Sequence, residues 1–238
     1  MIASYKHGFI FFKTRKTAGS SIEFALGPHC GPQDIVAPIG PSEDRDRASL
    51  TGVVPMNIAH DRSYEARYVA ALKRGNKKLI RELLVGHRQQ GGIVAHEAAL
   101  TLKPRLAPEF WDRAFKFTVE RHPYEKALSL AWFRYRTSGD FMAHLDRVVH
   151  TMAEDYRGFH LYSIDNSSVA DVVMRHETLQ ADLDNVSRKL GLPILTLPFR
   201  RRHAGRDRRP ARDVLTEAQK AFILDVCRQE FELLGWAP

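Results

Sequence analysis

The segment GFIFFKTRKTAGSSIEFAL, residues 8–26, decides the fold that we predict for this chain. Residues 8–12 are mostly aromatic or β-branched and too few for a helix, which predicts a buried strand. Residues 20–26 are typical of the opening of a helix. A strand that leads through a Gly, Ser and Thr turn into a helix gathers backbone N–H groups and the positive end of a helix dipole, which together bind anions. Three basic residues add full charges to this turn: Lys13, Arg15 and Lys16.

A second strand and helix are expected further along the chain. Residues 115–120, FKFTVE, alternate apolar and polar side chains, and Pro123 then occupies a favourable first helical position. Because strands alternate with helices, we expect an α/β fold with a mainly parallel sheet flanked by helices. The length favours a single domain over residues 1–238.

The remaining elements are predicted from periodicity and from helix-capping residues. Helices are expected at residues 63–74, 77–85, 141–152 and 179–190. A last helix, with Thr216 and Gln219 as a capping box, is expected to end near Leu234. A short strand is expected at residues 93–95, and a helix is expected after it. Another short strand is expected at residues 169–174. Residues 27–47 are rich in Gly and Pro and are expected to form a surface loop.

The composition indicates anionic partners. The 238 residues are 44% hydrophobic with a formal net charge of +8, and the pI is about 9.6. Nucleic acid, an anionic membrane surface, a phosphorylated cofactor or a sulfated sugar would suit this charge. No apolar run is long enough to cross a bilayer, so we expect a cytoplasmic protein. The two cysteines lack CxxC spacing and no cluster has metal-ligand spacing, so we expect no bound metal.

Two short motifs carry the chemical prediction. In KTAGSS, Lys16 precedes the glycine, whereas a Walker phosphate-binding turn reads GxxxxGK[ST]. Lys16 can therefore reach over the turn while amides and hydroxyls hold an anion from beneath. In RHPYEKALS, Arg121 ends a strand and Ser129 follows about two helical turns later. Ligands of parallel sheets collect at the carboxyl ends of the strands, so both motifs are expected to open onto one crevice.

Together, KTAGSS and RHPYEKALS resemble the two cofactor-binding motifs of sulfotransferases that use 3′-phosphoadenosine 5′-phosphosulfate (PAPS). The similarity is to the branch that modifies carbohydrates, including bacterial members, and it extends through residues 30–44, 110–130 and 172–192. It implies a P-loop-like sulfotransferase fold and transfer of a sulfuryl group to a hydroxyl of a carbohydrate or small metabolite. Arg15 stands where relatives usually have proline, and Lys126 where they often have arginine.

The resemblance also implies roles for individual residues. Lys16 would contact the sulfuryl group and the bridging oxygen of the leaving phosphate. The residues that would bind the 5′-phosphosulfate are Arg15, Lys16, Thr17, Ala18, Gly19, Ser20 and Ser21. Arg121 and Ser129 would bind the 3′-phosphate. The alternative interpretation from the residues alone is that Arg121 is a surface cation that closes a strand and Ser129 a hydroxyl on a helix face.

Sulfuryl transfer also needs a base that takes the proton of the acceptor hydroxyl. His96 is the leading candidate because it lies at a predicted turn, histidine titrates near neutral pH, and the resembling family has a histidine there. Glu23, one turn into the first helix, is the alternative base, although an acid there can simply complement the helix dipole. His60 and His87 also remain candidates.

Two other functions stay open at this stage. Seven arginines between Arg200 and Arg212 are compatible with a nucleic-acid-binding protein, although no specific nucleic-acid module surrounds them. The same arginines would otherwise border the cofactor's 3′-phosphate or an anionic acceptor. A P-loop-like kinase is the third hypothesis, which the order of lysine and glycine in KTAGSS disfavours. The identity of the acceptor and the oligomeric state do not follow from the sequence.

Overall fold

The structure, a computed structural model, describes residues 1–59, 61–135, 140–198 and 209–238. The strands are β1 (Ile2–Ser4), β2 (Phe9–Phe12), β3 (Ile35–Val36), β4 (Phe115–Glu120), β5 (Ser163–Ile164), β6 (Ser167–Ser168) and β7 (Val172–Arg175). Across the described ranges they form a five-stranded sheet in the order β3-β1-β2-β4-β7 and a separate β5-β6 pair.

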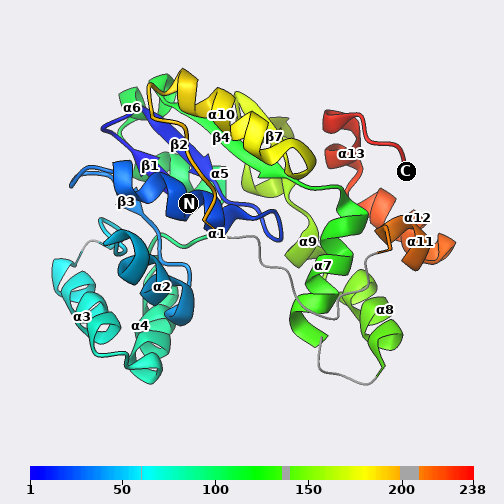
Figure 1. Cartoon of the computed structure of the whole chain (residues 1–238), viewed down its shortest axis with the longest axis horizontal. Helices are drawn as coiled ribbons and strands as arrows, with labels where there is room; N and C mark the ends of the chain where they lie inside the picture. The colour runs from blue at the N-terminus through cyan, green and yellow to red at the C-terminus, as the bar shows by residue number, and fades with distance from the viewer. Residues whose placement is uncertain (60, 136–139, 199–208) are drawn as a thin grey trace.

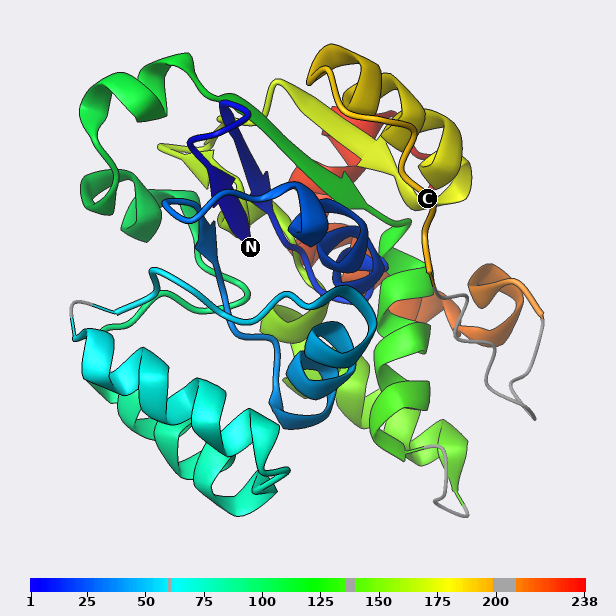
Figure 2. The same ribbon diagram turned by 60° about the vertical axis from the view of Figure 1, so that its left-hand side comes forward.

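Helices surround the five-stranded sheet (Figure 1, Figure 2). The α-helices are α1 (Gly19–Leu26), α2 (Pro41–Thr51), α3 (Arg62–Lys73), α4 (Lys77–Gln89), α5 (Ala99–Leu102), α6 (Pro108–Arg113), α7 (Pro123–Tyr135), α8 (Phe141–Thr151), α9 (Ala153–Tyr156), α10 (Leu179–Lys189), α11 (Ala211–Val214), α12 (Glu217–Val226) and α13 (Arg228–Leu234). The 3-10 helices are η1 (Gly27–His29), η2 (Lys103–Arg105), η3 (Phe159–Leu161) and η4 (His176–Thr178).

Strand direction brings the two motifs of the sequence to one edge of the sheet. β2, β4 and β7 are parallel, and β1 is antiparallel to both β2 and β3. Phe12 lies beside Thr118, and Glu120 lies beside Arg175. The segments that follow β2, β4 and β7 therefore leave the sheet at the same edge, which we call the carboxyl edge. The start of β1 lies there too, because Ile2 pairs with Phe11.

The sheet is covered on both faces because successive side chains of a strand point to opposite sides. Phe11 packs in one cluster with Ile22 of α1 and Leu183 of α10. Phe12 packs in the other cluster with Trp111 of α6. Helices α7, α8 and α11 to α13 form a third cluster beyond the end of β4. In both views the α3-α4 pair and the α7-α8 pair lie on separate sides of the molecule (Figure 1, Figure 2).

Most predicted elements are confirmed. The chain forms one α/β domain with a largely parallel sheet, and the predicted segments correspond to β2, α1, β4 and the start of α7. The helices predicted at residues 63–74, 77–85, 141–152 and 179–190 are α3, α4, α8 and α10. Thr216 and Gln219 form the predicted capping box at the start of α12. In the described ranges no helix has the length and apolar character needed to cross a membrane.

The prediction of a surface loop at residues 27–47 is wrong. This segment contains η1, β3 and the first part of α2. Its Gly and Pro residues mark the ends of short elements, since Gly40 is the N-cap of α2 and Pro41 its first residue. The sequence of α2 is largely polar, so the burial of Asp44 and Arg47 was not predicted.

Three smaller predictions also need correction. Residues 93–95 form no strand, and Ile93 N–H donates a hydrogen bond to the Ile58 carbonyl. The last helix is interrupted at Cys227 and is two helices, α12 and α13. The strand predicted at residues 169–174 begins later, as β7. β1 was not predicted, because three residues are too few to show an alternating pattern.

A buried ion pair holds α2 against the sheet and α3. Arg47 Nη2 lies 2.8 Å from Asp44 Oδ1, and both side chains are fully buried. The hydroxyl of Tyr68 in α3 donates to Asp44 Oδ2 at 2.7 Å. Arg47 Nη2 also donates to the Ala37 carbonyl, just beyond β3. Asp44 and Arg47 therefore connect α2 to two neighbouring segments.

We expect Asp44→Ala to lower the free energy of unfolding by about 3–5 kcal/mol, because it leaves the Arg47 guanidinium buried without its counter-ion. Urea unfolding monitored by circular dichroism measures this loss. Asp225→Ala is the control, since Asp225 pairs with Arg228 at the surface, and its effect should stay within about 0.5 kcal/mol. Equal losses in the two variants would contradict the importance of the buried pair.

Candidate functional site: the turn between β2 and α1

The turn between β2 and α1 has an unusual backbone. Lys16 and Ala18 have φ angles of 61° and 66°, in the left-handed region that non-glycine residues seldom adopt. The first hydrogen bonds of α1 run from Ser21 N–H and Ile22 N–H to the Ala18 carbonyl. The N–H groups of Gly19 and Ser20 therefore precede the helical ladder, at the positive end of the helix dipole. Strain of this kind is often retained at ligand-binding turns.

Hydroxyl groups fix this turn to the end of β4. Thr14 Oγ1 donates to the Val119 carbonyl, and Thr17 Oγ1 lies 2.9 Å from Thr14 Oγ1. Thr17 is fully buried. Its side chain is therefore part of the connection between the two strands.

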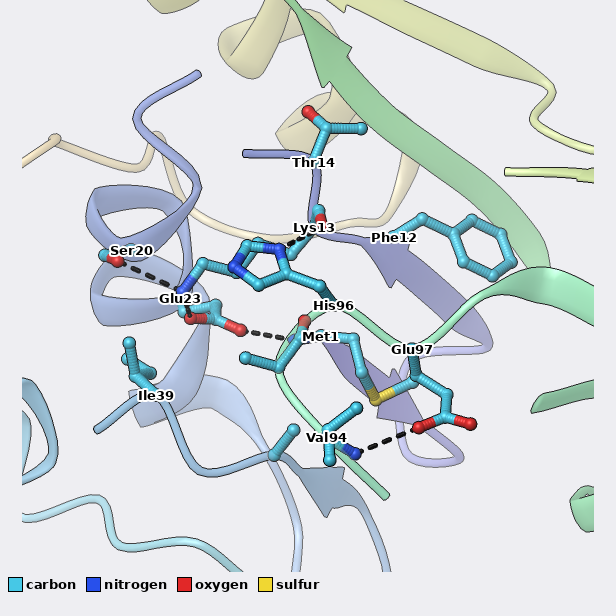
Figure 3. Close-up of polar contacts among 12 residues, drawn as sticks. Met1, Phe12, Lys13, Thr14, Ser20, Glu23, Ile39, Val94, His96 and Glu97 are labelled. Carbon is cyan, nitrogen blue, oxygen red and sulfur yellow. Dashed lines mark hydrogen bonds and ion pairs between the residues drawn. The ribbon is translucent and has the colours of Figure 1, made fainter. Parts of the chain in front are cut away.

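Beneath the turn lies a buried cluster of charges (Figure 3). Lys13 Nζ is 2.6 Å from Glu23 Oε2 and 3.0 Å from Ser20 Oγ. The other oxygen of Glu23 is 2.5 Å from the amino group of Met1. The side chain of Glu23 is fully buried, and that of Lys13 is 5% exposed. The cluster thus joins the strand, the helix and the start of β1.

Glu23 is held in its ionised form. Burial alone would raise its pKa, but the charges of Lys13 and of the Met1 amino group outweigh burial and lower the pKa to about 2. Both of its carboxylate oxygens are engaged and its side chain is fully buried, so neither oxygen is available to an acceptor hydroxyl. The structure therefore favours Glu23 as the counter-ion of Lys13 over Glu23 as a base.

His96 lies beside the same cluster (Figure 3). Its Nδ1 is 2.8 Å from the Lys13 carbonyl. A carbonyl only accepts, so Nδ1 carries the hydrogen and Nε2 of the neutral ring keeps its lone pair. Burial, with the nearby charges of Lys13 and Arg15, lowers the pKa of His96 to about 3. The ring is thus neutral at pH 7, with the tautomer that a general base needs.

The long basic side chains of the turn point toward α7 and α9. Lys16 Nζ lies 4.0 Å from the centre of the Phe133 ring, and Phe133 is 51% exposed. Arg15 Nη1 lies 3.5 Å from Asp155 Oδ1. Both residues are partly exposed, whereas Lys13 is buried.

The second motif begins where β4 ends, at the carboxyl edge. Arg121 Nη2 is 2.8 Å from Glu125 Oε2, and Glu125 Oε1 accepts from the Ala211 N–H at 2.7 Å. Arg121 is thus paired with a residue in the first turn of α7. Ser129 lies farther along α7 and is partly buried. Lys126 is fully buried and pairs with Glu120 at 2.7 Å, which makes it part of the protein interior.

The other predicted site residues lie in different surroundings. His87 is buried in the core, where Nε2 donates to the Ile93 carbonyl at 2.8 Å and the ring stacks on Tyr64. His60 lies outside the described residues, as does most of the arginine-rich segment. Within the described ranges, no group of three or more His, Cys, Asp or Glu side chains could hold a metal ion.

The burial of Lys13 was not predicted. From the sequence this lysine is one more charge on the turn, whereas in the structure its side chain is buried. A Cβ atom added at Gly19 would lie 2.7 Å from Lys13 Cγ, so the glycine accommodates the lysine stem. The acidic residue ten positions later, Glu23, was a possible signal of this burial. A helix that packs back on the preceding strand brings Lys13 and Glu23 together.

Comparisons with protein-family models, with curated proteins and with solved structures found no match to this chain.

The low pKa of His96 predicts a dependence of stability on pH. The unfolded chain binds a proton at this histidine below its ordinary pKa of 6.5, whereas the folded chain does so only near 3, so the stability contribution is complete above pH 6.5 and is lost as the pH falls. Between pH 7 and pH 5 this loss is about 2 kcal/mol. Urea unfolding of His96→Gln should therefore show a correspondingly smaller decrease than the wild type. Equal decreases would contradict the partly buried, neutral ring.

Proposed function

We propose that this chain is a PAPS-dependent sulfotransferase, with a P-loop-like sulfotransferase fold, that transfers a sulfuryl group to a hydroxyl of a carbohydrate or small metabolite. The observation that carries the proposal is the meeting of two strand-turn-helix units at the carboxyl edge. Lys16 follows β2 and Arg121 follows β4, and these strands are adjacent and parallel. This is the arrangement in which α/β sheets hold ligands.

The residues of the turn suit a phosphosulfate. The N–H groups of Gly19 and Ser20 and the start of α1 favour an anion, and Lys16 adds a positive charge nearby. Arg121 would hold the 3′-phosphate, either in place of its ion pair with Glu125 or in addition to it. When bound, PAPS supplies an activated sulfuryl group attached to its 5′-phosphate. The expected roles of Ser21 and Ser129 remain part of the proposal.

In the proposed reaction His96 and Lys16 act at opposite ends of the transferred group. His96 Nε2 accepts the proton of the acceptor hydroxyl, whose oxygen forms the new bond to sulfur while the bond from sulfur to the 5′-phosphate oxygen breaks. Lys16 stabilises the negative charge that develops on that oxygen. Burial is the main cause of the low pKa of His96, and the charges of Lys13 and Arg15 add to it; a bound polyanion offsets these charges, so we expect it to raise the pKa in part.

The proposal predicts specific stabilisation by the product, adenosine 3′,5′-bisphosphate (PAP). At about 100 times its dissociation constant, PAP should raise the melting temperature by about 5–10 °C. We expect Lys16→Ala to reduce this shift, and Lys78→Ala, an exposed lysine of α4, to retain it. AMP should not reproduce it, because it lacks the 3′-phosphate.

Other outcomes of the same experiment would point to other functions. Stabilisation by ATP with Mg²⁺ but not by PAP would favour a kinase. Binding of random DNA that falls steeply with salt and does not respond to PAP would favour a nucleic-acid-binding protein.

The proposed roles also predict different effects of three substitutions. We expect Lys16→Ala to abolish PAP release from PAPS, and His96→Ala to lower turnover with little change in PAP affinity. We expect Arg121→Ala to weaken PAP binding about tenfold to a hundredfold, because a hydrogen bond to a charged group is lost.

Calorimetry and chromatographic detection of PAP, with a panel of simple sugars as acceptors, measure these effects. Arg113→Ala is the control for Arg121, since Arg113 ends α6 before β4 begins. Near-normal turnover of Lys16→Ala would refute the proposed mechanism.

A further inference from the structure

We infer that Lys13 is a positioning residue of the site: its buried ammonium directs the Ser20 hydroxyl toward the bound anion, and its carbonyl holds His96. This inference rests on the proposed function, because it concerns the same anion and the same base. Three different parts of Lys13 contribute, namely the ammonium, the aliphatic stem and the backbone carbonyl.

The ammonium determines which way the Ser20 hydroxyl can donate. Lys13 Nζ donates to Ser20 Oγ at 3.0 Å and to Glu23 Oε2 at 2.6 Å. A serine hydroxyl has one hydrogen, and an oxygen that accepts from an ammonium directs that hydrogen elsewhere. Ser20 is only partly buried and belongs to the first turn of α1. Its hydroxyl is therefore a donor on the side where an anion would meet the helix.

The stem of Lys13 sets the separation between the strand and the helix. A Cβ at Gly19 would lie 2.7 Å from Cγ, 3.3 Å from Cε and 3.4 Å from Cδ of Lys13. The stem thus runs beneath Gly19 along most of its length. The Lys13 side chain therefore packs against the backbone at Gly19, where the N–H groups of Gly19 and Ser20 begin the helix.

The backbone carbonyl of Lys13 also holds His96, the proposed base. It accepts the His96 Nδ1 hydrogen at 2.8 Å (Figure 3). The donor to the anion and the base for the acceptor are therefore held by one residue. Reactive groups must keep their mutual placement closely, and a rigid shared support achieves this.

Lys13 also has a structural role, because removing one partner of its buried pair with Glu23 destabilises the fold. Lys13→Met keeps the stem and removes the charge, so the inference predicts an effect on ligand binding beyond any effect on folding. Lys116→Met is the matched control. Lys116 is also a buried lysine, but it lies at the opposite end of β4, where Nζ donates to the Ala114 carbonyl.

A double-mutant cycle tests this inference. PAP dissociation constants would be measured by calorimetry for the wild type, Lys13→Met, Ser20→Ala, the double variant and Lys116→Met. We expect each single variant of the site to weaken PAP binding about tenfold. The double variant should be no weaker than the single variants, because Lys13 acts through Ser20. Lys116→Met should bind PAP like the wild type.

The possible failures are distinguishable. If the wild type does not bind PAP, the proposed function fails and this inference fails with it. If the wild type binds PAP and Lys13→Met binds equally well, or if the two losses add in full, only the inference is overturned. If Lys13→Met does not fold, Ser20→Ala decides, since undiminished PAP binding in that variant overturns the inference.

Discussion

The ion pair between Lys13 and Glu23 is the contact on which the candidate site depends. Both side chains are withdrawn from water, so neither charge can lose its partner without a large cost in free energy. Lys13 follows β2 and Glu23 lies in α1, so the pair fixes the helix relative to the strand. Gly19 leaves room for the lysine stem, and His96 is bonded to the lysine carbonyl. The turn above them is thereby held in its unusual backbone conformation.

The fold could be predicted where local sequence and long-range packing agree. β2 and β4 have the apolar and alternating patterns of strands, and Pro123 marks the start of α7. The prediction failed where a tertiary contact decides the structure. The helix α2 looks like a polar loop, since only the burial of Asp44 with Arg47 makes it part of the core. β1 is a strand because it pairs with two neighbours, which three residues of sequence do not reveal.

The meeting of the two motifs at one edge of the sheet was predicted from the sequence, whereas the contacts around them were predicted only in part. The motifs placed Lys16 and Arg121 at one edge of the sheet, as parallel strands require. The sequence also indicated His96, but the carbonyl that fixes its tautomer comes from a residue 83 positions away. Lys13 was expected only as one more charge at the turn, because residue order does not reveal burial. Glu23 was a candidate base until its contacts with Lys13 and with the Met1 amino group became visible.

A crystal structure with PAP bound tests the central claim most directly, because it locates the anion and identifies its ligands together. We predict that the 5′-phosphate lies within hydrogen-bond distance of the Gly19 and Ser20 N–H groups, with Lys16 extended over it. The 3′-phosphate should lie on Arg121, at the end of β4. PAP bound away from the carboxyl edge, or no bound PAP at saturating concentration, would contradict the assignment of this turn as the cofactor site.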